Sequence, residues 1–122
     1  MHFNPELMRE ILVLIDDRPA GEPFEGLINS DLSTQAEVNE HMQILLDSDY
    51  LNGQSLRDHR NVPIKFSIGG LTMKGHEFLA NARNNTVWKK VMVQAQEKGQ
   101  SVGMTVLNGL LEQAAKKYAG LD

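Results

Sequence analysis

Apolar side chains recur every three or four residues early in the chain, which is the spacing of one helix face. The first such stripe consists of Leu7, Ile11, Leu14 and Ile15. It follows Asn4-Pro5, an N-cap with a proline for the first turn. The second stripe consists of Val38, Met42, Leu45 and Leu46. It follows Thr34, which forms a capping box with Glu37. These patterns predict helices over residues 5–17 and 34–48.

The pattern changes between these helices and after the second one. Leu27-Ile28 is a brief apolar run that we predict to be a short strand, and "NSDLS" after it leaves room for a turn only. The segments "YLNGQSLR" and "IKFSIGGL" have mixed β character and are joined by "DHRNVP". Residues 50–70 are therefore predicted to form a β-hairpin with a longer loop.

The stretch "LTMKGHEFLANARNNTVWKKV", residues 71–91, predicts the end of a strand followed by a helix. Thr72 can cap this helix, whose inward positions are Gly75, Phe78, Leu79 and Ala82. A helical glycine costs about 1 kcal/mol relative to alanine. We therefore expect another backbone to approach Gly75 closely.

Two more helices are predicted towards the C-terminus. The first presents Trp88, Val91, Met92 and Ala95 on one face, turns Lys89 and Lys90 away, and ends at Gly99. The second spans about residues 103–118 and presents Leu107, Leu110, Leu111, Ala114 and Tyr118. Core packing is the favoured role for Trp88, and a binding role is its alternative.

The order helix, short strand, helix, hairpin and further helices is that of a winged-helix domain, a relative of the helix-turn-helix whose hairpin is the wing. The predicted fold is therefore α+β, mostly α, with a C-terminal helical extension. The first helix of the helix-turn-helix pair is reduced to a turn or absent. We expect one domain over residues 1–122, with the winged-helix core at about 4–83 and the C-terminal helices at about 84–119.

Composition and charge limit the partners. Cysteine is absent, which suits a reducing compartment, and no signal peptide or membrane span is apparent, so we expect a cytoplasmic protein that has no membrane partner. The net charge of −4 combines −9 for residues 1–56 with +5 for residues 57–122. A pI near 5.5 does not imply general attraction to nucleic acid.

Several strings resemble the bacterial and phage family called domain of unknown function 2513: "REILVLI", "EVNEHMQILLDSDYL", the stretch 71–91 and "LLEQAAKKYAGL". The chain departs from the family where Met73 replaces an aromatic residue and Ser48-Asp49 replaces Ala-Gly. Asp tolerates a left-handed backbone better than most residues. The resemblance implies a winged-helix-like fold and a prophage setting, and it implies no activity.

No catalytic motif is apparent, so we expect no enzyme, cofactor or metal site. The four histidines, His2, His41, His59 and His76, are scattered, and no pair has the spacing of a helical zinc site. We expect His41 to be a hydrogen-bonded residue at the core edge and His76 to lie on the surface near Arg83.

Fold analogy suggests a DNA-binding transcriptional regulator. Its candidate contacts are Arg57, His59, Arg60 and Lys65 around the wing, and Gln35, Asn39 and Gln43 on the second helix. The outward face of that helix, however, carries Ala36, Glu37, Glu40, Gln43, Ile44 and Asp47, and the helix has no Lys or Arg.

The alternative is a non-catalytic adaptor or inhibitor that binds a host or phage protein and has lost DNA binding. The acidic second helix and an exposed Ile44 favour it. The C-terminal helices suit a homodimer interface, and a monomer is equally compatible with them. Convergence of basic residues on one face would favour double-stranded DNA as the partner, and scattered charges would favour the adaptor.

Overall fold

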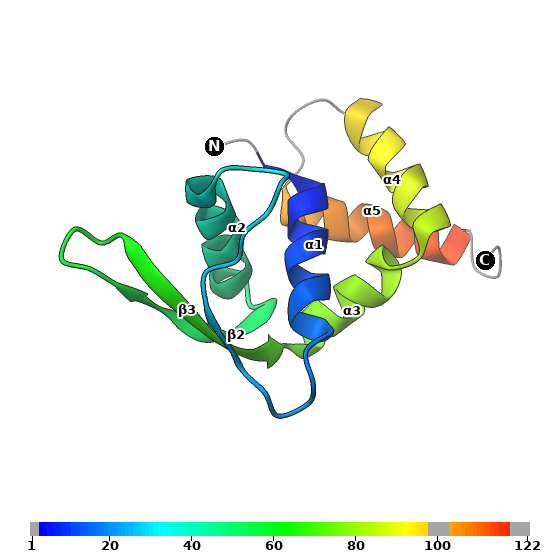
Figure 1. Cartoon of the computed structure of the whole chain (residues 1–122). Helices are drawn as coiled ribbons and strands as arrows, with labels where there is room; N and C mark the ends of the chain where they lie inside the picture. The colour runs from blue at the N-terminus through cyan, green and yellow to red at the C-terminus, as the bar shows by residue number, and fades with distance from the viewer. Residues whose placement is uncertain (1–2, 98–102, 118–122) are drawn as a thin grey trace. The chain divides into compact units, whose positions relative to one another are not determined.

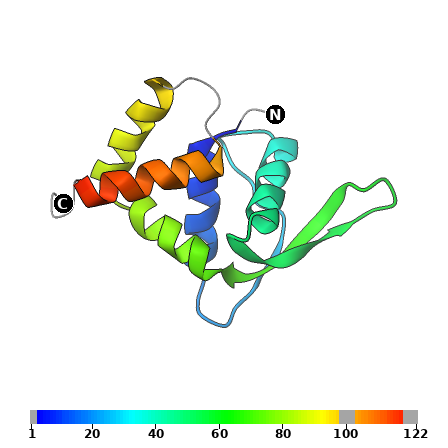
Figure 2. The same ribbon diagram turned by 180° about the vertical axis from the view of Figure 1, so that it is seen from behind.

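The computed structural model describes residues 3–97 and 103–117. Within these residues the fold is α+β and mostly helical, with five helices and a three-stranded antiparallel sheet (Figure 1, and from behind in Figure 2). The elements are α1 (Pro5–Asp16), β1 (Phe24–Gly26), α2 (Gln35–Asp47), β2 (Leu51–Arg57), β3 (Pro63–Leu71), α3 (Met73–Ala82), α4 (Asn85–Glu97) and α5 (Met104–Lys117). They divide into two compact units, Met1–His76 and Glu77–Asp122. The single-domain organisation stays a prediction.

Helices α1 and α2 begin at the predicted caps. The Asn4 side chain accepts a hydrogen bond from the Leu7 amide at 3.2 Å, and the Thr34 hydroxyl accepts one from the Glu37 amide at 3.3 Å. Each cap satisfies an amide that has no partner within its helix. The buried residues of α2 are Val38, His41, Met42 and Leu45. Leu46, predicted in this stripe, is only half-buried.

The buried face of α1 is rotated from the predicted stripe. Its members are Leu7, Met8, Ile11, Leu12 and Ile15. Leu14, predicted to be inward, is 46 % exposed. At 3.6 residues per turn, Leu14 lies about 90° from the middle of the buried face. The prediction for Leu14 was therefore wrong, because Met8 and Leu12 widen the face on the opposite side.

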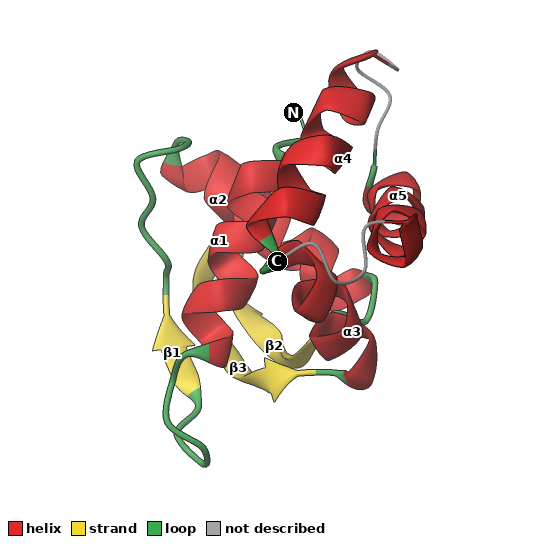
Figure 3. Cartoon of the chain, turned by 90° about the vertical axis from the view of Figure 1, so that its right-hand side faces the viewer, coloured by secondary structure: helices red, strands yellow, loops and turns green. Residues whose placement is uncertain are grey.

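The sheet has the strand order β1-β3-β2, and all neighbours are antiparallel (Figure 3). The predicted hairpin is confirmed as β2 and β3. Phe66 and Ile68 of β3 are buried, and Lys65 and Ser67 lie on the opposite face because successive side chains alternate along a strand.

The short first strand lies at Phe24–Gly26, so its prediction at Leu27-Ile28 was wrong. Phe24 pairs with Ile68 and Gly26 pairs with Phe66, and these partners cannot be identified from a local apolar run. Ile28 is buried within the connection to α2. That connection contains a turn at residues 31–32 and no helix, as predicted from its length.

The junction between β3 and α3 confirms the expected role of Gly75. The Thr72 hydroxyl accepts a hydrogen bond from the Gly75 amide at 3.0 Å, and the Thr72 amide donates one to the Tyr50 carbonyl at 3.1 Å. A Cβ atom on Gly75 would lie 2.2 Å from the Tyr50 carbonyl oxygen. Asp49 has the left-handed φ of 64° that its residue type tolerates.

The second unit contains α4 and α5, which pack against each other. Asn84 caps α4 by accepting a hydrogen bond from the Val87 amide at 3.1 Å. The buried residues of the two helices are Val87, Trp88, Val91, Ala95, Met104, Leu107, Leu110, Leu111 and Ala114. Met92 is half-buried, Lys89 and Lys90 are exposed, and the predicted Gly99 and Tyr118 lie outside the described residues.

Candidate functional site between α2 and the β2–β3 hairpin

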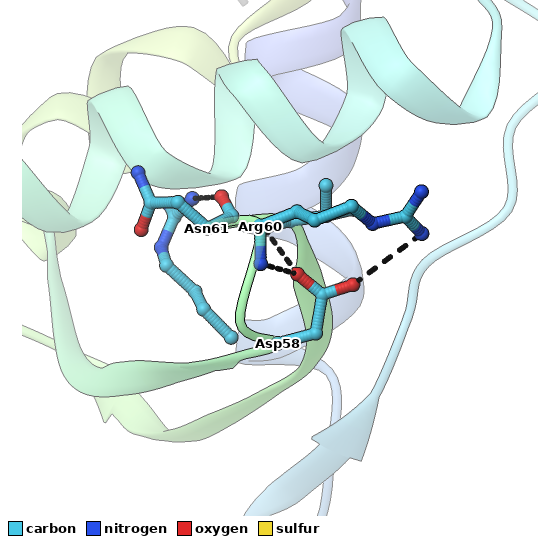
Figure 4. A network of polar contacts seen from close by, with 5 residues as sticks. Asp58, Arg60 and Asn61 are labelled. Atoms are coloured by element: carbon cyan, nitrogen blue, oxygen red, sulfur yellow. Dashed lines mark hydrogen bonds and ion pairs between the residues drawn. The ribbon is translucent and has the colours of Figure 1, made fainter.

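The hairpin loop at residues 58–62 is held in one shape by its own polar groups. The Asp58 amide donates to the Val62 carbonyl and the Asn61 amide donates to the Asp58 carbonyl, both at 2.9 Å. The Asp58 carboxylate accepts from the amides of Arg60 at 2.8 Å and Val62 at 3.0 Å (Figure 4). Asn61 adopts a left-handed φ of 64°, which Asn tolerates. The sequence Asp-His-Arg-Asn therefore encodes a specific turn.

Arg57 and Gln43, both predicted to contact DNA, contact each other. The Arg57 guanidinium donates to the Gln43 side-chain oxygen, to the Asn61 carbonyl at 2.9 Å and to the Ser55 hydroxyl at 3.2 Å. Gln43 also accepts from the Ser55 hydroxyl at 3.2 Å and donates to Asp47 at 2.8 Å. These bonds, which we call the Gln43–Arg57 contact, join α2 to the hairpin.

The other residues predicted to contact DNA lie on different parts of the hairpin. Arg60 lies in the loop, where its side chain is 74 % exposed and 3.7 Å from the Asp58 carboxylate. His59 is exposed in the same loop. Lys65 lies on the sheet face opposite Phe66, and its ammonium group is 3.5 Å from the Glu25 carboxylate. Two of the three cations thus have a nearby carboxylate, and Arg57 is held by neutral acceptors.

The remaining predicted residues on α2 have a structural role. The Gln35 side-chain amide donates to the Ile28 carbonyl and to the Asn39 side-chain oxygen, both at 2.9 Å. These bonds fasten the segment that precedes α2 to the first turns of the helix. Asn39 also lines a groove beside the helix.

This groove lies between α2 and the hairpin and has a volume of about 660 Å³. Its lining residues are Ala36, Asn39, Glu40, Gln43, Ile44, Asp47, Arg57, Asn61, Val62 and Pro63. Ile44 was predicted to be exposed and is half-buried, because it lies in this lining. The sequence signal for the groove was Ile44, an apolar residue on the face of the second helix that was expected to be exposed.

Other basic residues of the first unit are also held by nearby groups. Arg18 lies over the Phe24 ring at 5.6 Å and donates to the Pro23 carbonyl at 3.0 Å. Lys74 lies over the Tyr50 ring at 4.6 Å and donates to the Ser48 carbonyl at 3.0 Å. These two residues and the three hairpin cations, Arg57, Arg60 and Lys65, are therefore distributed over several elements.

The hydrogen bonding expected of His41 and the surface position expected of His76 are confirmed, and the expected position of His76 near Arg83 stays a prediction. His41 is fully buried; its Nδ1 donates to the Glu37 carbonyl at 2.7 Å and its Nε2 accepts from the Asn4 amide at 2.9 Å. His76 lies on the surface with its Nδ1 3.7 Å from Asp16. His2 lies outside the described residues. No group of three potential metal ligands is found in the part of the chain that the structure describes.

A family model described as "Hypothetical protein (DUF2513)" matches residues 2–101. The chain belongs to the DUF2513 family. No curated protein and no solved structure matches it.

In this DUF2513 chain, α1, α2, the hairpin, α3 and α4 lie within the matched range, and α5 lies beyond it. The string "LLEQAAKKYAGL", which also resembled the family, therefore falls outside the match. Among the described residues, no helix has the length and apolar character needed to cross a bilayer. The family description names no activity.

Proposed function

We propose that this DUF2513 chain is a non-catalytic protein-interaction module of the winged-helix type, which contacts its partner through α2 and the β2–β3 hairpin. The element order α1, β1, α2, β2, β3 and the strand order β1-β3-β2 support the winged-helix assignment. In this assignment α2 occupies the place of the recognition helix and the hairpin is the wing.

The observation that carries the proposal is the Gln43–Arg57 contact. A side chain that reads DNA must present its donors and acceptors to a base edge or a phosphate. Gln43 uses both ends of its amide within the protein, and Gln35 donates to the chain before α2. Breaking these bonds to contact DNA would sacrifice contacts that hold the hairpin and the connecting segment in place.

The charge of α2 also favours a protein partner. Residues 35–47 contain Glu37, Glu40 and Asp47 and no Lys or Arg. Contacts of Lys and Arg side chains with phosphates supply most of the non-specific affinity of a protein for DNA. An acidic helix repels those phosphates. The scattered basic groups of residues 3–76 support the same choice.

A salt series tests the proposal against DNA binding. Fluorescence anisotropy is measured with two labelled DNA duplexes, one of random sequence and one from the DNA upstream of the gene for this chain. Neither duplex should show salt-dependent binding with a Kd below about 0.1 mM. In parallel, a photo-crosslinking residue at Glu40 should form protein adducts in the cells that make this chain. The same residue at Glu77, which is exposed on α3, is the matched control. Adducts with DNA from the Glu40 position would overturn the proposal.

A DNA-binding regulator remains the second candidate because Arg60 and His59 are exposed at the tip of the hairpin. Arg60 contributing one phosphate contact would add about −0.9 to the slope of log K against log salt. Replacing Arg60 with Gln would then flatten the slope by about that amount. A prophage setting and a regulatory role belong to this second candidate and stay predictions.

A further inference from the structure

The groove between α2 and the hairpin has an apolar part, which we call its apolar centre. Four of its lining residues, Ala36, Ile44, Val62 and Pro63, present hydrocarbon surface. Val62 is 48 % exposed and Ile44 is half-buried, so part of this apolar surface faces the groove rather than the core. Covering it with an apolar side chain of a partner would remove it from water and favour binding.

Along α2, the carboxylates of Glu40 and Asp47 lie on either side of Ile44. Glu40 and Asp47 are exposed, line the groove and lie seven residues apart. Among the described residues neither forms an ion pair, although Asp47 accepts one hydrogen bond from Gln43. The one cation of the lining, Arg57, is held by the neutral acceptors of Gln43, Ser55 and Asn61. The exposed charge along the helix side of the groove is therefore negative.

The spacing of Glu40, Ile44 and Asp47 along α2 indicates what kind of partner fits the groove. With a rise of about 1.5 Å per residue, Glu40 and Asp47 lie about 10 Å apart along the α2 axis. In a second helix lying along α2, two residues that are seven positions apart have the same separation, so they can stand opposite Glu40 and Asp47. Its residues between them, three and four positions from the first, face the same side and would meet Ile44.

We propose that this groove binds an amphipathic helix of a partner protein, with apolar side chains in its centre and Lys or Arg residues seven positions apart paired with Glu40 and Asp47. The inference rests on the proposed protein-interaction function. It adds the place and the chemistry of the contact. Helices commonly dock into grooves through such apolar anchors.

The test begins with a displayed library of random 16-residue segments, selected on the full chain. Enriched segments should carry apolar residues flanked by two basic residues seven positions apart. The combined substitutions Glu40→Gln and Asp47→Asn should weaken an enriched synthetic peptide about threefold to tenfold, as expected for two exposed ion pairs. Asn at position 47 keeps the acceptor for Gln43. Glu77→Gln, which removes an exposed carboxylate outside the lining, should leave the affinity unchanged.

The apolar centre is tested separately by Val62→Ser, which should also lower the affinity for the enriched peptide. Circular dichroism on every variant shows whether the fold is retained. Enrichment of acidic segments, or of none, overturns the proposal. Basic segments whose binding survives both the carboxylate and the Val62 substitutions reject this groove and leave the protein-interaction function intact. Salt-dependent binding to duplex DNA rejects the proposed function itself.

Discussion

Replacing Gly75 with Ala should destabilise the protein, although alanine is the better helix former. Propensity alone would favour the substitution by about 1 kcal/mol. The new Cβ atom, however, would lie 2.2 Å from the Tyr50 carbonyl oxygen, which belongs to the backbone. That oxygen also accepts the Thr72 amide at 3.1 Å. Relieving the overlap requires a shift of about 1 Å, which overpacks the junction at a cost of about 1 to 3 kcal/mol.

Weakening the hydrogen bond from Thr72 adds about 0.5 to 1.5 kcal/mol. After the gain in propensity, we expect a net loss of about 0.5 to 3.5 kcal/mol in the free energy of unfolding. Urea denaturation followed by far-ultraviolet circular dichroism measures it. With an m-value of about 1 to 3 kcal/mol per molar urea, the midpoint should fall by roughly 1 M.

Gly109 of α5 is the matched control. It is an exposed helical glycine with no atom within 4 Å of a Cβ placed on it. Gly109→Ala should therefore raise the free energy of unfolding by about 0.5 to 1 kcal/mol. Opposite signs for the two substitutions support the close-approach explanation. An equal gain at Gly75 would refute it, because the gain would mean that the Tyr50 backbone moves away at negligible cost.

Five further substitutions test other parts of the structure. Trp88→Ala should cost about 3 to 5 kcal/mol in chemical denaturation, since Trp88 is 3 % exposed, and a loss below about 1 kcal/mol would contradict core packing. His41→Phe keeps the ring and removes its two backbone hydrogen bonds, and should cost about 1 to 3 kcal/mol. Gln43→Ala removes the acceptor of Arg57 and should speed amide hydrogen exchange in the hairpin loop. Arg60→Gln changes an exposed side chain and should change the free energy of unfolding by less than about 0.5 kcal/mol. The predicted homodimer is tested at Val106, which is 45 % exposed on α5. Val106→Glu should convert a dimer to monomers in analytical sedimentation. If the wild-type protein is already a monomer at high concentration, the dimer prediction is wrong.

Local sequence patterns identified most elements because their causes lie within a few residues. Thr34 and Glu37 are three positions apart, and Thr72 caps a helix that starts at the next residue. The family also followed from the sequence and was confirmed by the match to residues 2–101. The resemblance carried the family prediction, and no local physical rule required it.

Strand β1 and the exposed Leu14 were predicted incorrectly for the opposite reason. Three residues form a strand at Phe24–Gly26 because β3 supplies hydrogen-bonding partners about 40 residues away, so no run of apolar letters marks the place. Leu14 fits a helical stripe by spacing, and only the packing of α1 decides which side of that stripe is covered.

The candidate site shows the same division. The sequence determined that α2 is acidic and that the hairpin carries Arg57 and Arg60. Only the tertiary structure decided that Arg57 bonds to Gln43, 14 residues earlier, and that Lys65 lies beside Glu25, 40 residues earlier. A side chain's charge and hydrogen-bonding groups are fixed by its type. Whether they are available to a partner depends on which groups the folded chain brings within about 3 Å of them.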